Sequence, residues 1–205
     1  MIGWEKFNRI AYRMIELAYI NILWLLFTLI GLVAFGVFPA TTAMFTVIRK
    51  LIKKEENFKI YPTFWQSFRS DFFKANGFGL IFIVIAYFFY FDFYFLQLNS
   101  GKLEFLFPIL IFIMISGIVT LLFFFPVYTH FNLRFFQYFK QSFFIAITSP
   151  VEVIAIGTLA VFIYFVATIF PGIIPLFTGS VFAYAATLFS YRAFSRIEKR
   201  QNVQL

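Results

Sequence analysis

The sequence predicts an all-α fold, namely a polytopic bundle of transmembrane helices with interfacial amphipathic helices beside it. Of the 205 residues, 62% are hydrophobic and only 13% are charged, whereas about 25% of the residues in soluble domains carry a charge. Residues 153–191 contain no acidic or basic side chain, and this stretch is about twice as long as the helix that a bilayer requires. Lipid must therefore be part of the solvent, and a helix satisfies its own backbone hydrogen bonds there.

Residues 1–48 divide into an amphipathic part and a long uncharged part. Aromatic and basic side chains are mixed through residues 1–16, which predicts a short interfacial helix leading into the membrane. The uncharged stretch 17–48 is too long for one upright span, and we expect Gly36 and Pro39 to interrupt it. The segment after Pro39, residues 39–52, is short. It either crosses the membrane fully or is a re-entrant helix that returns to the same side.

Residues 49–74 form the most basic stretch of the chain, and aromatic side chains recur in it at helical spacing. They are Phe64, Trp65, Phe68, Phe72 and Phe73. Such a combination is typical of a segment at a membrane surface, where basic residues bind anionic lipids. Proteins that bind single-stranded nucleic acid show it too. Its place between apolar spans favours lipid, so we expect no nucleic-acid partner.

Two apolar stretches follow the basic region, separated by a short polar link. The first, residues 75–96, is interrupted only by Asp92. The second, residues 105–128, contains Pro126, which we expect to bend the helix near its end. Both stretches are long enough to cross a bilayer as helices.

Residues 130–147 are amphipathic and are expected to form a helix in the plane of the membrane interface. On such a helix one face would be polar, with His130, Arg134, Gln137 and Gln141. Phenylalanine side chains recur at the same spacing and would occupy another face.

The C-terminal part of the chain has the pattern of a transmembrane hairpin. Pro150 marks the start of a helix, and the sequence Pro171-Gly172-x-x-Pro175 marks a turn. In total we expect six membrane segments, with five as the alternative, in one domain that covers residues 1–205. The segments are 15–37, 39–52, 75–96, 105–128, 151–170 and 176–193.

The distribution of basic residues predicts the orientation. With six crossings, all but one of the 17 Lys and Arg residues lie on the same side of the membrane as both termini. The positive-inside rule makes that side the cytoplasm. We therefore expect a multi-pass protein of the cell membrane with cytoplasmic N- and C-termini.

The sequence excludes several kinds of chemistry. Cysteine is absent, and histidine occurs once, at position 130. Disulfides, thiolate metal sites and multi-histidine metal sites are therefore excluded, and we expect neither a metal nor a cofactor. The sequence also lacks a HExxH motif, a Walker loop and paired protease aspartates, so we expect no catalytic residue and no enzyme activity.

Five polar residues within or beside the spans are candidates for function, and each also has a structural explanation. Asn21, Thr41 and Thr42 suit hydrogen bonds to a neighbouring helix, or contacts to a ligand. Asp92 lies late in its span near the headgroups, yet it is the best candidate for binding a proton or cation. Glu152 lies in a first helical turn, where the helix dipole stabilises an anion.

Several short motifs together resemble the YesL-like family of bacterial integral membrane proteins, whose molecular function is unknown. The motifs are Asn21-x-x-Trp24, Pro39-Ala40-Thr41-Thr42-Ala43, Arg49-Lys50-Leu51, the run Phe64/Phe68/Phe72 to Asn76-Gly77, Phe125-Pro126, and Pro171. Such proteins often accompany genes for carbohydrate uptake, including sugar ABC transporters. The resemblance therefore implies an auxiliary role beside sugar import, with transporter subunits as partners. The alternative is a small solute carrier or channel in its own right.

Overall fold

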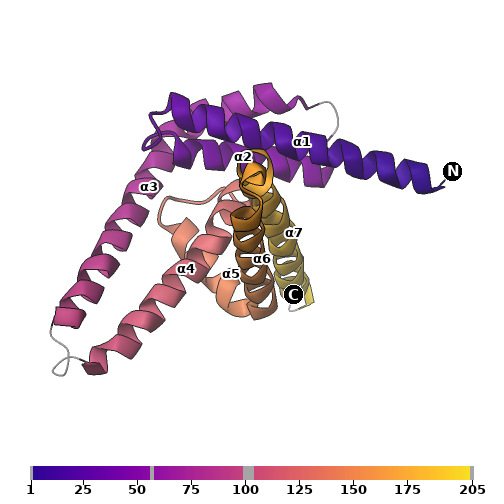
Figure 1. The fold of residues 1–205 in the computed structure, drawn as a ribbon. Coiled ribbons are helices and arrows are strands. Elements are labelled where there is room, and N and C mark those ends of the chain that lie inside the picture. The colour runs from indigo at the N-terminus through magenta and orange to yellow at the C-terminus, as the bar shows by residue number, and fades with distance from the viewer. Residues whose placement is uncertain (1, 56–57, 99–103, 204–205) are drawn as a thin grey trace.

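The computed structural model describes residues 2–55, 58–98 and 104–203, and their regular secondary structure is entirely helical (Figure 1). The helices are α1 (Ile2–Ile30), α2 (Val37–Lys53), α3 (Ile60–Leu98), η1 (Glu104–Leu106), α4 (Phe107–His130), α5 (Gln137–Thr148), α6 (Pro150–Ile169), η2 (Pro171–Ile173) and α7 (Ile174–Val203), where η denotes a 3₁₀ helix. The predicted all-α fold is therefore confirmed.

The turn between α1 and α2, residues 31–36, depends on close contact between two glycines. A Cβ atom on Gly31 would lie 2.3 Å from the Cα atom of Gly36, so a larger residue does not fit at this position. Leu32 and Val33 both adopt positive φ angles, of 55° and 61°. The reversal of the chain is thus tight, and it strains two bulky residues.

The first helix differs in extent from the two expected segments. The interfacial helix expected at 1–16 and the span expected at 15–37 form a single helix, α1, which ends at Ile30. Between Trp4 and Ile30 the sequence contains neither glycine nor proline, so nothing interrupts the helix.

α3 is also longer than predicted. Its 39 residues correspond to about 58 Å, roughly twice the thickness of the hydrocarbon core of a bilayer. We expected a surface segment at 49–74 and a separate span at 75–96, but α3 runs unbroken from Ile60 through both. Figure 1 shows that its first part lies beside α1 and α2 and that the helix then runs away from them, paired with α4.

The first part of α3, with α1 and α2, forms what we call the N-terminal layer. Phe64 and Phe68, which we expected at a membrane surface, are instead buried in this layer. Their ring centroids lie 5.1 Å and 5.0 Å from that of Phe27 in α1. Trp65 and Phe73 remain exposed, so only part of the aromatic set faces outward.

A second close contact joins α2 to α3. The ring of Phe38 covers Gly79 so closely that a Cβ atom there would lie 2.2 Å from a ring carbon. Gly79 therefore allows α2 to approach α3, as small residues do between membrane helices.

α5 is shorter than the amphipathic helix expected at 130–147. His130 ends α4, and residues 131–136 are not helical, so His130 and Arg134 do not share a helical face with Gln137. Phe135 stacks on Phe78 of α3 with 4.0 Å between ring centroids. Phe135 and Phe139 thus pack against protein, whereas Phe136, Phe143 and Phe144 remain exposed.

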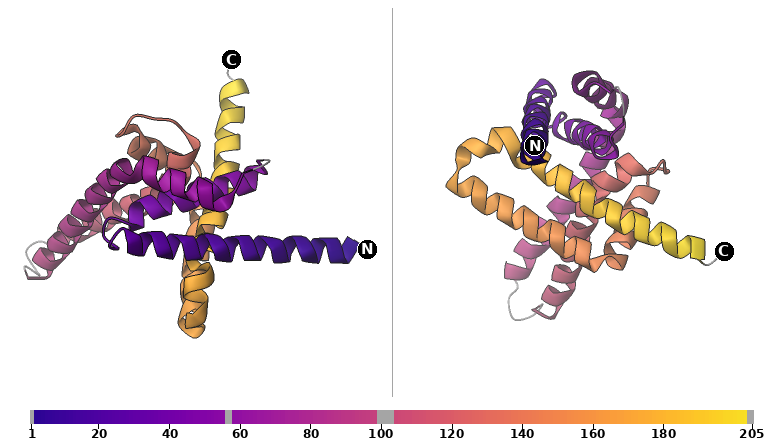
Figure 2. Two further views of the ribbon diagram at one scale, coloured as in Figure 1. Left: turned by 90° about the horizontal axis from the view of Figure 1, so that it is seen from above. Right: turned by 90° about the vertical axis from the view of Figure 1, so that its right-hand side faces the viewer.

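α6 and α7 form the predicted hairpin, and Figure 2 shows the two helices side by side. The turn lies at η2, where Pro171 begins the 3₁₀ helix. α7 continues to Val203, well past the expected end of the segment at 193, because no residue in the basic tail breaks a helix.

Five helical stretches of the described residues are long and apolar enough to cross a membrane. They are Trp4–Ile30, Ile60–Leu98, Phe107–His130, Pro150–Ile169 and Pro171–Glu198. This number agrees with the alternative of five segments rather than with the preferred six. α2 is not among them, because its 17 residues are at the lower limit for a span and much of it is buried between other helices.

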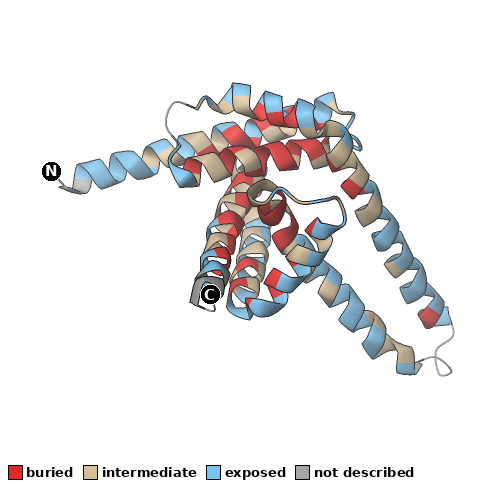
Figure 3. Ribbon diagram, turned by 180° about the vertical axis from the view of Figure 1, so that it is seen from behind, coloured by how far each residue is buried: buried red, intermediate tan, exposed pale blue. Residues whose placement is uncertain are grey.

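Figure 3 shows where the helices bury one another. Buried positions concentrate where the N-terminal layer meets α4 and α7, and most of the projecting α3–α4 pair is exposed. The exposed side chains on α3, α4 and α6 are largely apolar. Exposed apolar helices of this length indicate a multi-pass membrane protein.

Candidate functional site

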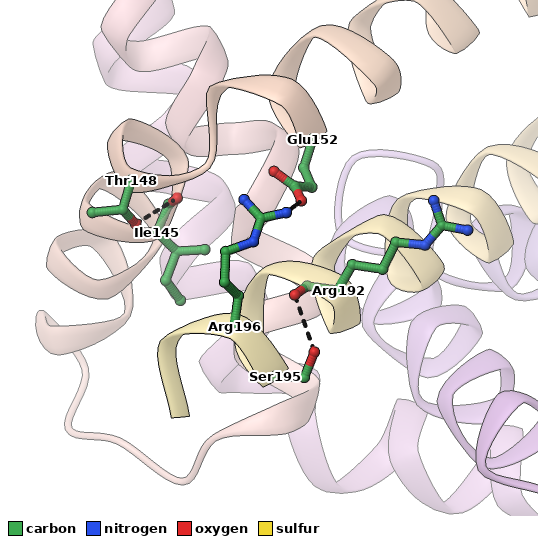
Figure 4. A network of polar contacts seen from close by, with 6 residues as sticks. All are labelled: Ile145, Thr148, Glu152, Arg192, Ser195 and Arg196. Carbon is green, nitrogen blue, oxygen red and sulfur yellow. Dashed lines mark hydrogen bonds and ion pairs between the residues drawn. The ribbon is translucent and has the colours of Figure 1, made fainter. Parts of the chain in front are cut away.

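A polar network lies where the start of α6 meets the last part of α7 (Figure 4). Glu152 is only 3% exposed, and its carboxylate forms an ion pair with the guanidinium group of Arg196. In Figure 4 the Arg196 side chain points toward Glu152, whereas that of Arg192 points away. Nearby, the Ser195 hydroxyl donates a hydrogen bond to the carbonyl oxygen of Arg192 at 3.1 Å.

Local sequence features place this pair. Pro150 occupies the first turn of α6, and the helix dipole at that end stabilises the carboxylate of Glu152. Glu152 and Arg196 lie the same number of residues before and after Ile174, so an antiparallel hairpin brings them side by side. In the sequence, Arg196 belongs to a basic C-terminal tail with Arg192, Lys199 and Arg200, and only its equal spacing about the turn marks it as a partner of Glu152.

The network retains unused hydrogen-bonding capacity. Glu152 Oε2 and, three residues earlier, Ser149 Oγ are buried and have no hydrogen-bond partner among the described residues. Since more than about 90% of buried polar groups in proteins are paired, these atoms can take a further partner, for which water suffices. The ion pair nevertheless supplies the main polar contact between the far ends of α6 and α7.

Asn21 forms the polar contact between α1 and the start of α7. Its amide nitrogen donates to the carbonyl oxygen of Pro175 at 2.8 Å and to that of Ile174 at 3.3 Å. Its amide oxygen accepts from the backbone N–H of Ser180 at 2.9 Å. Asn21 is fully buried in this contact between helices. Of the two roles expected for it, the structure shows the hydrogen bond to a neighbouring helix.

The two threonines differ in their contacts. Thr41 accepts a hydrogen bond of 3.0 Å from the indole nitrogen of Trp24 and thereby joins α2 to α1. Thr42 donates to the carbonyl oxygen of Pro39 within its own helix, at 2.8 Å. The expectation of a contact between helices is therefore confirmed for Thr41 and wrong for Thr42.

Asp92 lies apart from the other candidates. It is exposed on α3 and lines a shallow groove between α3 and α4, together with Leu96 and Ile109. The five predicted residues therefore do not form one site. Asn21 and Thr41 lie at contacts of α1, Glu152 lies at the far end of the α6–α7 hairpin, and Asp92 lies in the projecting pair.

Sequence reasoning missed a polar cluster where α3, α4 and α5 meet. The Lys74 ammonium group lies 5.0 Å and 4.8 Å from the ring centroids of Tyr128 and Tyr138, and it donates to the Tyr138 hydroxyl at 3.3 Å. The carboxylate of Asp71 interacts with Tyr128 and with Lys74. These residues come from distant parts of the sequence, and no short motif joins them.

This cluster combines a cation, two aromatic rings and a carboxylate. A cation held against ring faces is stabilised by the ring quadrupole, and more strongly where water is excluded. Tyr138 also accepts a hydrogen bond of 3.1 Å from the backbone N–H of Leu133, in the segment before α5. The cluster therefore fixes α5 against α3 and α4.

The grooves of the protein are lined mainly by apolar side chains. A second groove between α3 and α4, separate from the one that Asp92 lines, has a volume of about 310 Å³, and the small residues Ala86 and Gly117 lie on its two walls. Phe139 of α5 also lines it. Within the described part of the chain, no three His, Cys, Asp or Glu residues are placed to hold a metal ion.

The chain is similar to a family and to three proteins of Bacillus subtilis (strain 168). The family is described as "Protein of unknown function, DUF624" and matches residues 17–93. The uncharacterized protein YteU is 34% identical over 193 residues, which cover 93% of this chain and 86% of YteU. The uncharacterized protein YesL is 32% identical over 203 residues, covering 95% of this chain and 92% of YesL. The uncharacterized protein YesV is 27% identical over 191 residues, covering 92% and 91%. No solved structure matches the chain.

Proposed function

The chain belongs to the YesL-like family of unknown function, DUF624, and from this premise we propose that it is an auxiliary protein of carbohydrate uptake. In this role it binds other components of the cytoplasmic membrane, such as the subunits of a sugar ABC transporter, and catalyses no reaction. Its most basic segment, residues 49–74, lies on the cytoplasmic side and provides contacts to anionic lipids.

One structural observation carries the proposal. The polar side chains of the helices are largely used within the protein, as the contacts of Asn21, Thr41 and Glu152 illustrate. The outer faces of α3, α4 and α6 are apolar and exposed, and a groove with small residues lies between α3 and α4. Small residues allow the backbones of two membrane helices to approach closely, so this groove suits a helix of a partner subunit.

The proposal includes a topology with both termini in the cytoplasm. It requires α2 to cross the membrane in addition to the five candidate spans. Its length of 17 residues is at the lower limit of what a crossing needs. Ala40, Ala43 and Val47 are buried within the protein, so neighbouring helices rather than lipid surround this face of α2. The basic residues at the end of α2 then lie with those of α7 on the cytoplasmic side.

The direct test is purification of the tagged full-length chain from native membranes, followed by identification of the proteins that accompany it. We expect subunits of a sugar permease to be recovered with the wild type. An Ala86→Trp substitution fills the groove and should abolish the recovery. An Ile30→Trp substitution, on an exposed face of α1, should leave it unchanged. Purification that yields no transporter subunit at any detergent strength would contradict the proposal.

A second candidate function, a small solute carrier or channel, rests on Asp92. This carboxylate lines the groove between the outer halves of α3 and α4, where a proton or cation could bind. Purified protein in liposomes should then move a sugar, an ion or a metabolite, and an Asp92→Asn substitution should stop that flux. Equal flux through the wild type and the Asp92→Asn variant would rule out this role for Asp92.

A further inference from the structure

A second cluster of polar side chains lies where the C-terminal ends of α2 and α4 meet α7. The ring of His130, the last residue of α4, lies 5.1 Å from the ring of Tyr191 in α7, between centroids. The ammonium group of Lys53 lies 5.8 Å from the centroid of the Tyr191 ring. Arg49 is close enough to act electrostatically on both His130 and Tyr191.

Three buried atoms of this cluster lack hydrogen-bond partners among the described residues. They are Arg49 Nε, His130 Nδ1 and Tyr191 Oη. Unpaired buried polar atoms are uncommon in folded proteins, so three in one cluster favour a shared partner that satisfies them together. The guanidinium N–H of Arg49 can only donate and the hydroxyl of Tyr191 can donate as well, so a group with several acceptor atoms would satisfy both.

The charge of the surroundings favours an anion. Arg49, Lys50 and Lys53 all belong to the C-terminal end of α2, and two acidic residues partly offset their charge. The carboxylate of Glu55 lies 3.7 Å from Lys50, and that of Glu198 lies 4.0 Å from the other ring nitrogen of His130. Attraction to the C-terminal dipole of α2 explains Lys50 and Lys53 in its last turn.

Two features have no such explanation. The dipole of α2 does not account for the unpaired hydroxyl of Tyr191, which lies on another helix. The Nε atom of Arg49 likewise has no acceptor, and the dipole of α2 does not supply one. One oxyanion placed between the helices would satisfy both donors, because it presents several oxygen atoms in different directions.

We propose that Arg49, His130 and Tyr191 bind a phosphate group at this junction, with Lys53 adding positive charge. Arginine suits this chemistry, because its fixed fork of N–H donors matches the oxygen atoms of a phosphate. The phosphate belongs either to the headgroup of an anionic lipid or to a soluble phosphate ester. The proposal goes beyond the auxiliary role in uptake and stands without it, since it rests on the cluster alone.

The test uses two probes on the purified full-length protein. Inorganic phosphate is titrated into detergent-solubilised protein while the thermal midpoint of unfolding is followed. Retention of phosphatidylglycerol is counted by native mass spectrometry after release from membranes of phosphatidylcholine and phosphatidylglycerol. We expect one probe to bind the wild type at least about tenfold more tightly than the Arg49→Gln variant, because a charged hydrogen bond is lost.

Tyr191→Phe is the more selective variant, since it removes only the hydroxyl and keeps the ring against His130 and Phe194. It should fold as well as the wild type and bind the same probe several-fold more weakly. The matched controls are Arg69→Gln and Tyr61→Phe, which alter exposed residues of α3 and should bind like the wild type.

The outcomes separate the two sources of phosphate. A rise in the midpoint with inorganic phosphate, absent from the Arg49→Gln variant, identifies a soluble ligand. Retention of phosphatidylglycerol without any response to inorganic phosphate identifies a lipid headgroup. If neither probe distinguishes the wild type from the Arg49→Gln and Tyr191→Phe variants, the cluster holds water only and the proposal is wrong.

Discussion

Glu152 at the start of α6 and Arg196 in the last part of α7 are joined by an ion pair at the end of the hairpin that lies farthest from its turn. The carboxylate is buried, whereas the Arg196 side chain is 45% exposed. The pair therefore combines a costly buried charge with a partner that water can still reach.

An Arg196→Gln substitution should lower the free energy of unfolding by about 2 kcal/mol, because it leaves the Glu152 carboxylate buried without its cation. The effect is smaller than that for a fully buried pair, since solvent screens the exposed guanidinium group. The measurement is unfolding in detergent, followed by helical circular dichroism.

Two variants serve as comparisons for that experiment. Arg192→Gln removes the same charge from an exposed position and should change stability little. The double variant Glu152→Gln/Arg196→Gln should be more stable than Arg196→Gln alone, because no buried charge remains. A double variant that is less stable than either single variant would show that the pair does not act as described.

An Asn21→Ala substitution should lower the free energy of unfolding by about 1 to 2 kcal/mol. It leaves the Ser180 N–H and the Pro175 carbonyl without their partner in a buried contact between α1 and α7. Asn8→Ala, on an exposed part of the same helix, is the control and should be neutral. Equal stability of the two variants would mean that Asn21 does not hold α7.

A Gly79→Ala substitution should destabilise the protein by about 1 to 3 kcal/mol, because the new methyl group collides with the Phe38 ring. Gly157→Ala is the matched control, since a Cβ atom there meets nothing within 4 Å. We expect that control to keep or raise the stability, because alanine favours a helix over glycine. A second change, Phe38→Ala, should relieve the collision in the Gly79→Ala background.

The topology can be tested by labelling single cysteines, since the sequence contains no cysteine of its own. In intact cells, an impermeant thiol reagent should modify Phe35→Cys and Gly172→Cys and leave Lys6→Cys and Lys54→Cys unmodified. This pattern requires α2 to cross the membrane. Modification of Lys54→Cys from outside, with Lys6→Cys protected, would instead show that α2 re-enters on the outer side.

The sequence predicts turns better than it predicts helix continuity. The hairpin turn at Pro171 appears where the proline and glycine signals place it. The sequence predicts a division at residue 75, because the first part of α3 is amphipathic and its second part is apolar except for Asp92. Backbone hydrogen bonding is indifferent to that change of composition, so α3 continues from its amphipathic part into its apolar part.

The polar contacts were harder to predict, for a different reason. Asn21 is recognisable as a buried polar residue of a span, but its partners on α7 lie more than 150 residues away in the sequence. Lys74 and Tyr138 are likewise brought together only by the packing of α3 on α5. Pairs of this kind become predictable when a turn fixes the register, as it does for Glu152 and Arg196.

The unbroken course of α3 has a mechanical consequence. One end of this helix is held in the N-terminal layer by Phe64 and Phe68, and the other end leaves the layer with α4. A stiff rod held at one end acts as a lever. A load applied to the outer half of α3 is therefore transmitted as torque to α1 and α2.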